Sequence, residues 1–452
     1  MNRRAWRWLA VLMAFGLIAA ACGDDDDDGG ASGDGDGGVS SESFLERAEA
    51  GEFDGTTVVG RGSFTGEDAE RFAVSMEAFE EATGIDVQYT GSGDFEAQIT
   101  IDVEGGNAPD IAMIAQPGLF SDLARNGDLV ALDGTAIEAV TQDNYAETWL
   151  NLGTVDDSFY GPFFRVNMKS LVWYPVPEFA DAGYEIPETW DEMIALSDQM
   201  VADGNTPWCI GIESESATGW VATDWVEDIM LRTVEPEVYD QWVANEVPFT
   251  DERVKNAVEL MGEIWLNEDY VLGGTDNILT VPFGNAQDPM FQETPQCWMH
   301  RQASFITGFF PEGTVVGQDG DTDAFYLPPI DESLGSPVLG AGDVVAIFDG
   351  NDRPEVLALV EYLATPEAAE GWASFGGFTS PNQNFDISIY PEGFDQTVAE
   401  FIVNADTFRF DASDVMPAAV GAGTFWSGMV DYVNGGNLDS ILQEIDDSWP
   451  SS

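Results

Sequence analysis

A cluster of polar side chains at residues 165–169 is the first candidate for ligand binding. Arg165, Asn167 and Lys169 alternate there with apolar residues, in a chain that has only 15 basic residues. Guanidinium, ammonium and amide groups can all hydrogen-bond strongly to a polar ligand. The same groups could instead pair with the 83 acidic residues of the chain. We expect Arg165 and Asn167 to face the ligand.

Two aromatic rings flank a carboxylate a little further along the chain. Trp220 and Trp225 stand five residues apart, a spacing that does not put both rings on one face of a helix. One ring is therefore expected to pack in the core while the other offers a flat apolar surface to a ligand. We expect Trp220 to be that surface and Asp224 to accept hydrogen bonds.

The elements that must position these side chains alternate between strands and helices. Residues 56–60 and 85–89 are apolar and β-branched, as expected of buried strands, and Phe72, Met76 and Phe79 share one helical face between them. A strand–helix–strand unit of this kind joins parallel strands. The predicted fold class is therefore α/β, with ligands expected at the carboxyl ends of the strands.

Local signals place the ends of these and later elements. Thr65 and Asp68 fit a capping box at the start of the first helix, and Gly84 is expected to end it. Further elements follow the same patterns: strands at 111–115, 170–174 and 344–348, and helices at 95–104, 118–124, 187–202, 223–232, 253–266, 354–363 and 366–374.

Composition limits the classes of function. The chain has 452 residues and a formal net charge of −68, yet 44% of its residues are hydrophobic, enough for a large core. It is therefore not a disordered acidic chain, and a nucleic-acid partner is not expected, because phosphate binding needs a basic surface. An acidic surface stays hydrated at high ionic strength, so we expect stability to rise with salt, and unchanged melting up to molar salt would contradict this.

The first 53 residues are expected to be an export and anchoring segment. Residues 1–21 have a basic start followed by a short apolar stretch, as in a signal peptide. Small residues precede Cys22, which predicts lipid attachment there, although ordinary cleavage near Ala21 remains an alternative. The acidic, Gly- and Ser-rich stretch within 22–53 is expected to be an extended tether, which would hold the protein outside the cell membrane.

The two remaining cysteines, Cys209 and Cys297, are expected to form a disulfide, since an exported chain matures in an oxidising compartment. Two buried thiols are the alternative. The single histidine, His300, and the cysteine spacing do not match a zinc site, and no metal or other cofactor is expected.

Four segments, taken in order, resemble the extracellular solute-binding proteins of the carbohydrate class, the maltose-binding-protein-like receptors of ABC importers. They are GSFTGE at 62–67, GGNAPDI at 105–111, KSLVWY at 169–174 with PETWDE at 187–192, and TPEAA at 365–369. The stretches at 208–212, 219–228 and 297–305 are similar to the α-glucoside-binding branch.

The resemblance implies two lobes that close on an oligosaccharide, without catalysis. It places 54–166 and 341–376 in lobe 1, and 167–340 and 377–452 in lobe 2. It also implies separate permease subunits as partners. We expect a monomer.

A sugar ring has apolar faces and a rim of hydroxyls, so its site needs aromatic surfaces and polar side chains. Gly340 to Asp343 form a turn in which glycines allow close backbone approach, and Arg301 is expected to donate to vicinal hydroxyls. The candidate sugar-binding residues are Phe64, Thr65, Glu67, Gln116, Arg165, Asn167, Trp220, Asp224, Arg301, Asp343 and Phe378.

Two other classes of function fit the sequence less well. An exported glycoside hydrolase would use paired carboxylates, but so acidic a chain offers such pairs by chance. A receptor of the same fold could bind a polyamine through acidic residues, or a glycerol-phosphate diester through Arg165, Lys169 and Arg301.

Overall fold

The computed structural model describes residues 43–404 and 407–450. The predicted signal peptide at 1–21 and the predicted lipid site Cys22 lie outside these ranges. Within them, every helix is too short or too polar to cross a bilayer.

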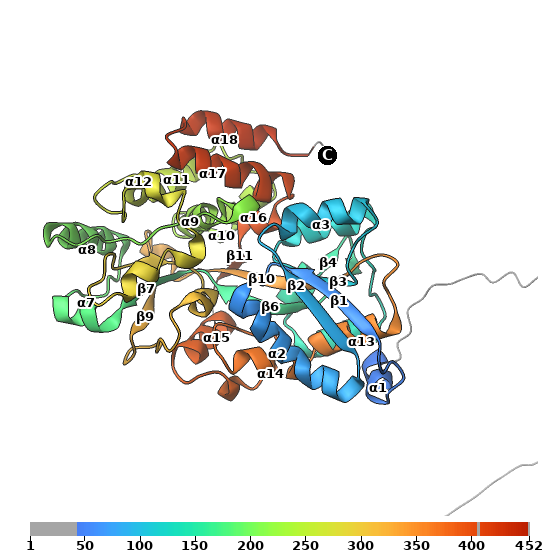
Figure 1. Cartoon of the computed structure of the whole chain (residues 1–452). Coiled ribbons are helices and arrows are strands. Elements are labelled where there is room, and N and C mark those ends of the chain that lie inside the picture. The colour runs from blue at the N-terminus through green and yellow to red at the C-terminus, as the bar shows by residue number, and fades with distance from the viewer. Residues whose placement is uncertain (1–42, 405–406, 451–452) are drawn as a thin grey trace, which may run out of the picture. The chain divides into compact units, whose positions relative to one another are not determined.

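A six-stranded sheet forms the centre of what we call the first lobe (Figure 1). β1 (Thr57–Gly62) pairs in parallel with β2 (Asp86–Gly91) and β3 (Ile111–Ile114), which confirms the predicted parallel start. β10 (Val338–Ile347) runs antiparallel to β3 and to β6 (Phe163–Met168), and parallel to β11 (Phe408–Phe410).

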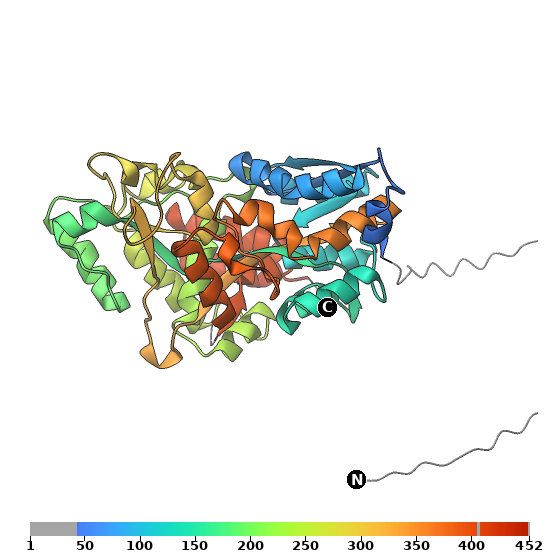
Figure 2. The same ribbon diagram turned by 90° about the horizontal axis from the view of Figure 1, so that it is seen from below.

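The inner strands β3 and β10 are buried at every position, whereas the edge strand β2 is partly exposed. Ile111 and Met113 enter one hydrophobic core, and Ala112 and Ile114 enter another. The first core is covered by α2 (Gly66–Thr83), α13 (Pro354–Leu363) and α14 (Glu367–Ala373), which lie close together in Figure 2. The other core contains residues of α3 (Phe95–Glu104) and α4 (Pro117–Asn126).

The second lobe surrounds a three-stranded antiparallel sheet in the order β8-β7-β9. These strands are β7 (Leu171–Pro175), β8 (His300–Arg301) and β9 (Thr322–Tyr326). Its separate core is rich in helices: α8 (Trp190–Ala202), α9 (Trp220–Leu231), α11 (Glu252–Trp265), α17 (Trp426–Val433) and α18 (Leu438–Asp447).

Smaller elements connect the two lobes and cover their edges. They are α5 (Ala136–Asn144), α6 (Glu147–Leu152), β4 (Thr154–Val155), β5 (Ser158–Phe159), α7 (Val176–Ala182), η1 (Glu215–Ala217), α10 (Pro236–Val243), α12 (Thr275–Ile278), η2 (Phe283–Asn285), η3 (Asp288–Phe291), η4 (Ser304–Phe309), η5 (Glu332–Leu334), η6 (Ile387–Ile389), α15 (Phe394–Asn404), α16 (Ala412–Val415) and the π-helix η7 (Ala419–Phe425).

Two strand connections run from one lobe to the other. β6 ends at Met168 and β7 begins at Leu171, so residues 169–170 join the two sheets. β10 has Leu339, near its start, in the core of the second lobe and ends beside β3 in the sheet of the first. The predicted lobe boundaries remain a prediction, although Phe378, Phe385 and Tyr390 pack with the first core.

Two local expectations were wrong. The predicted tether at 22–53 includes α1 (Phe44–Glu49), which packs against α13. Ser43 Oγ and the Phe44 backbone N–H donate hydrogen bonds to the Glu361 carboxylate, so the folded part begins by Ser43. The capping box does not form: Thr65 precedes α2 without a side-chain cap bond among the described residues, and Asp68 binds Arg165 instead.

Candidate functional site

A cavity of about 170 Å³ is lined by residues of both lobes and of the strands between them. The first lobe contributes Ser63, Thr65, Asp68, Ser92, Gly93, Glu96, Ala115 and Gln116. The second contributes Ser214, Ala217, Trp220, Phe283, Phe305, Phe309, Asp414 and Trp426, and the connecting strands contribute Arg165, Asn167, Lys169, Ala341, Gly342 and Asp343.

Parallel strands bring the first-lobe residues to one place. β1 ends at Gly62 and is followed by Ser63 and Thr65, and β3 ends at Ile114 and is followed by Gln116. Because these strands run in parallel, their carboxyl ends meet at the same edge of the sheet. Thr65 and Gln116 therefore lie at the strand ends where the sequence placed them, and both line the cavity.

A close approach of two strands places the charged groups of the cavity floor. A Cβ on Gly342 would lie 2.6 Å from the Arg165 carbonyl oxygen, so only glycine fits where β10 crosses β6. The neighbouring Asp343 then pairs with Arg165, whose Nε lies 2.8 Å from Asp343 Oδ2.

Arg165 is a buried cation with two carboxylate partners. Its Nη1 donates to Asp68 Oδ2 at 2.8 Å, and its guanidinium lies 4.4 Å from the centre of the Phe64 ring. Burial opposes its charge, but Asp343 and Asp68 outweigh that effect and raise the pKa of Arg165. Asp343 Oδ1 is buried and has no hydrogen-bond partner among the described residues, so it is an unused acceptor at the cavity.

Lys169 is the second cation at the cavity, and it too is neutralised. Its Nζ donates to Asp224 Oδ1 at 2.7 Å and to Asp411, and it lies 5.5 Å from the centre of the Trp220 ring. Burial raises the pKa of Asp224 to about 8 against the effect of Lys169. Burial would also raise the pKa of Asp411, but Lys169 and hydrogen bonds from neighbouring carboxyls keep it below its usual range.

Arg301 lies behind the residues that line the cavity and is not one of them. Its Nη2 donates to Asp228 Oδ2 at 2.8 Å and to the Asp224 carbonyl at 3.0 Å, and its side chain is fully buried. Neither Arg301 nor Asp224 lines the cavity. The two residues connect α9 with β8. We therefore no longer expect them to contact a sugar directly, and we assign them a structural role behind the cavity.

Aromatic side chains form the second-lobe wall. Trp220 is half-buried and packs edge-on against Phe283 at 5.2 Å between ring centres, while Trp225 is buried in the core. The expected division between the two tryptophans therefore agrees with their burial. Phe305 and Phe309 extend this wall, and Trp426 lines the same cavity from α17.

Of the predicted sugar-binding residues, six line the cavity: Thr65, Gln116, Arg165, Asn167, Trp220 and Asp343. Three others, besides Asp224 and Arg301, do not line it. Phe64 is buried beneath Arg165, Glu67 pairs with Arg71 on the surface at 2.7 Å, and Phe378 packs in the first core 5.3 Å from Phe164. We no longer expect these three to touch the ligand.

Several lining residues were missed because nothing in their local sequence distinguishes them. Glu96 is one of many acidic residues on helices, yet it faces the cavity, and burial raises its pKa to about 7. Phe305 and Phe309 are spaced four residues apart, which could have suggested a shared face. No comparable spacing in the sequence pointed to Trp426.

The carboxylates of Asp224, Glu227 and Asp411 lie within 4.8 Å of one another, close enough for a metal ion. Lys169 Nζ already binds two of them, so an ammonium group supplies the positive charge at this place. Burial raises the pKa of Glu227, which lowers the negative charge of the group further. We assign no metal to it.

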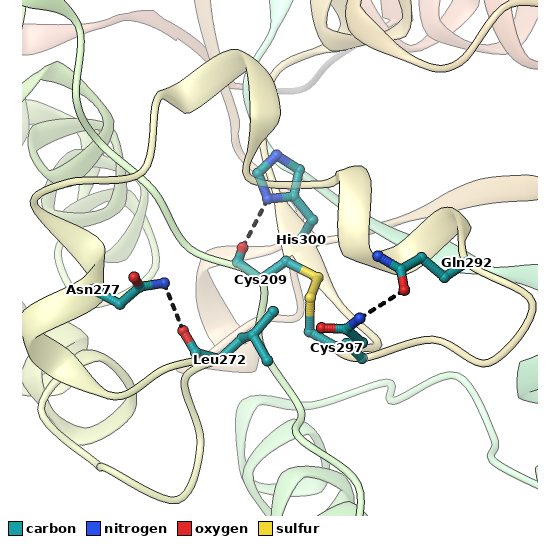
Figure 3. Close-up of a disulfide and its surroundings, with 7 residues drawn as sticks. Cys209, Leu272, Asn277, Gln292, Cys297 and His300 are labelled. Carbon is teal, nitrogen blue, oxygen red and sulfur yellow. Dashed lines mark hydrogen bonds between the residues drawn. A yellow bond between two sulfur atoms is a disulfide. The ribbon is translucent and has the colours of Figure 1, made fainter.

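The predicted disulfide between Cys209 and Cys297 is present (Figure 3). It ties the loop after α8 to the segment before β8, and beside it His300 Nδ1 donates to the Cys209 carbonyl at 2.8 Å. His300 is 2% exposed, and burial lowers its pKa to about 4. The histidine is thus a structural residue.

The buried histidine predicts a pH-dependent loss of stability. The unfolded chain binds a proton on His300 below pH 6.5 and the folded chain does so only near pH 4, so stability is lost as the pH falls through this window. We expect His300→Asn to remove up to about 3 kcal/mol of that loss. Urea unfolding of both proteins from pH 7 to pH 4 measures it, and parallel curves would contradict it.

Residues 65–370 match the family of bacterial extracellular solute-binding proteins. The chain is 47% identical over 389 residues to the osmoprotective compounds-binding protein GgtB of Synechocystis sp., covering 86% of this chain and 91% of that protein. It is 42% identical over 406 residues to the alpha-glucosides-binding periplasmic protein AglE of Rhizobium meliloti, covering 88% of each. The chain belongs to this family of solute-binding proteins.

Solved structures agree on a two-lobed fold. The bacterial solute receptor AcbH, described as preferring β-D-galactopyranose, superposes with a TM-score of 0.75 at 17% identity, covering 87% of this chain and 98% of that one. The RafE complex with raffinose superposes with a TM-score of 0.69 at 18% identity, covering 87% of this chain and 98% of that one. At these identities the likeness concerns the fold.

Proposed function

We propose that the chain is the receptor of an ABC importer and binds a neutral α-glucoside in the cavity between its lobes. The observation that carries this proposal is the pairing of both lining cations: Arg165 and Lys169 each bind two carboxylates. An anionic ligand would find no free positive charge among the described lining residues. Hydroxyl groups, in contrast, can donate to Asp343 Oδ1 and to Gln116 Oε1, which lack partners among these residues.

The same pairing argues against a glycerol-phosphate diester as ligand. Arg165, Lys169 and Arg301 were the groups that such a ligand would need, and each is held by buried carboxylates. The neutral rim of hydroxyls on a sugar fits the cavity better, and the rings of Trp220 and Trp426 can cover its apolar faces.

The relatives support the choice of ligand class. AglE is named for α-glucosides and GgtB for osmoprotective compounds. An osmoprotective glucoside would also suit an acidic protein adapted to salt.

Lipid attachment at Cys22 and a monomeric state are part of this proposal. Membrane fractionation of the full chain and of Cys22→Ala tests the anchor, and equal release of both would contradict it.

A thermal-shift screen tests the ligand class most cheaply, since a bound ligand raises the melting temperature by mass action. We expect at least one of trehalose, maltose, sucrose and palatinose to raise it, and a polyamine and a glycerol-phosphate diester not to. If all four sugars leave it unchanged, the α-glucoside assignment fails. Release of glucose from maltose or longer α-glucans would instead favour the hydrolase.

Trp220→Ala is expected to weaken binding of the sugar found in that screen by about 30- to 1000-fold, as for a central aromatic contact worth about 2–4 kcal/mol. Trp449→Ala is the matched control, because Trp449 is also half-buried in the second lobe but does not line the cavity. Calorimetric titration measures both. Equal affinities of the Trp220→Ala variant and the parent protein would remove Trp220 from the site.

A further inference from the structure

A second cavity adjoins the one described above. Its volume is about 190 Å³, against about 170 Å³ for the first, and the two share Glu96, Gln116 and Trp426 as lining residues. The remaining lining residues of the second cavity are Ala97, Thr100, Leu119, Ser216, Ala418 and Ala422. Because the cavities share a wall and have similar volumes, a ligand that fills the first can extend into the second.

The chemistry of the second cavity differs from that of the first. Apart from the shared Glu96, its described lining residues carry no charge. Besides the shared Gln116 and Trp426, they are alanine and leucine side chains and the two hydroxyl-bearing residues Thr100 and Ser216. Such a surface favours a group with exposed carbon and few hydroxyls, because apolar area removed from water stabilises the complex.

Gln116 lies at the junction of the two cavities. Its side chain is 3% exposed, and its Oε1 has no hydrogen-bond partner among the described residues. An unpaired buried amide is costly, so a ligand that spans the junction and donates to Gln116 removes that cost. The glycosidic oxygen of a sugar has no proton to donate, so the ring hydroxyl next to it would make this bond when the glycosidic end lies at the junction.

We propose that the second cavity is an aglycone site: the glycosyl ring binds beside Trp220 and Asp343, and a small apolar aglycone lies against Ala97, Ala418 and Ala422. This inference rests on the proposed function, because the first cavity must hold the glycosyl ring. It adds that the protein selects its ligand by what is attached to the sugar as well as by the sugar.

Two simple glucosides probe the two cavities separately. Methyl α-glucoside fills the first cavity alone, whereas n-butyl α-glucoside adds three methylene groups that would reach the second. We expect the butyl compound to bind at least tenfold more tightly, since each buried methylene strengthens binding several-fold.

Ala97→Trp is the test variant. Ala97 is exposed on α3, so a tryptophan fits without entering the core, and it lines the second cavity but not the first. We expect the tenfold preference for the butyl compound to fall below threefold, with methyl α-glucoside affinity unchanged within twofold. Ala422→Leu, in η7, should reduce the preference in the same direction. Ala139→Trp, at an exposed position on α5, is the matched control and should change neither affinity.

The outcomes are distinguishable. If neither glucoside nor any disaccharide binds the parent protein, the proposed function fails and this inference with it. If both glucosides bind with equal affinity, or if Ala97→Trp leaves the preference intact, the aglycone site alone is overturned. An equal loss for both glucosides in Ala97→Trp would also overturn it, because the two cavities would then not be separate parts of the site.

Discussion

Lys169→Met is expected to destabilise the protein by about 3–5 kcal/mol at pH 7, the usual cost of removing one partner from a buried ion pair. Lys169 is 5% exposed, and its Nζ binds Asp224 and Asp411 where β6 meets β7. Removal of the ammonium leaves these two carboxylates buried without their shared counter-ion. Urea unfolding of the parent and variant proteins measures the effect.

The deficit of this variant should shrink as the pH falls. The folded pKa of Lys169 is raised well above 10.5, so its contribution is complete at every pH below that value. The parent protein already gains some stability as the pH falls from 7 to 5, because burial raises the folded pKa of Asp224 and Glu227. The variant gains more, because Lys169 no longer holds the pKa of Asp411 low and this carboxyl also takes up a proton.

The chain provides a matched control for this prediction. Lys255 is the only other lysine and pairs with Asp439 on the surface. Lys255→Met is expected to leave the unfolding midpoint nearly unchanged, because exposed ion pairs contribute little. If both lysine variants behaved alike, the buried network would have no special role in stability.

Removal of the disulfide by Cys209→Ala together with Cys297→Ala is expected to cost about 4–5 kcal/mol, the chain-entropy value for a bond that closes a loop of this length. The two cysteines are 88 residues apart, and the loop between them contains α9 and α11, the main helices of the second core. Loss of the bond therefore gives the unfolded second lobe much more freedom.

Urea unfolding with and without reductant measures this effect. Reductant should destabilise the parent protein toward the level of the double variant and leave the double variant unaltered. A double variant as stable as the parent protein would show that packing alone holds the loop.

The sequence predicted the parts of the site that depend on local signals. The strand positions before Thr65 and Gln116 were evident from short apolar runs, and parallel pairing then placed both residues at one edge. The pairing of Cys209 with Cys297 followed from export and cysteine count.

The sequence could not show which polar groups are already occupied. Arg301 and Asp224 have side chains suited to a sugar, but long-range packing turns them toward Asp228 and Lys169. Phe64 was similarly misplaced, because its position beneath Arg165 depends on the contact of α14 with α2. Glu96 and Trp426 were missed for the same reason: only the packing of two lobes brings them to one cavity.

Calorimetric titration of the protein with α-glucosides, followed by recovery of the sugar, tests the central claim most directly. We predict saturable binding of one neutral glucoside per chain, and chromatography of the recovered sugar should show it intact. Absence of binding for every neutral glucoside, or cleavage of the recovered sugar, would contradict the account.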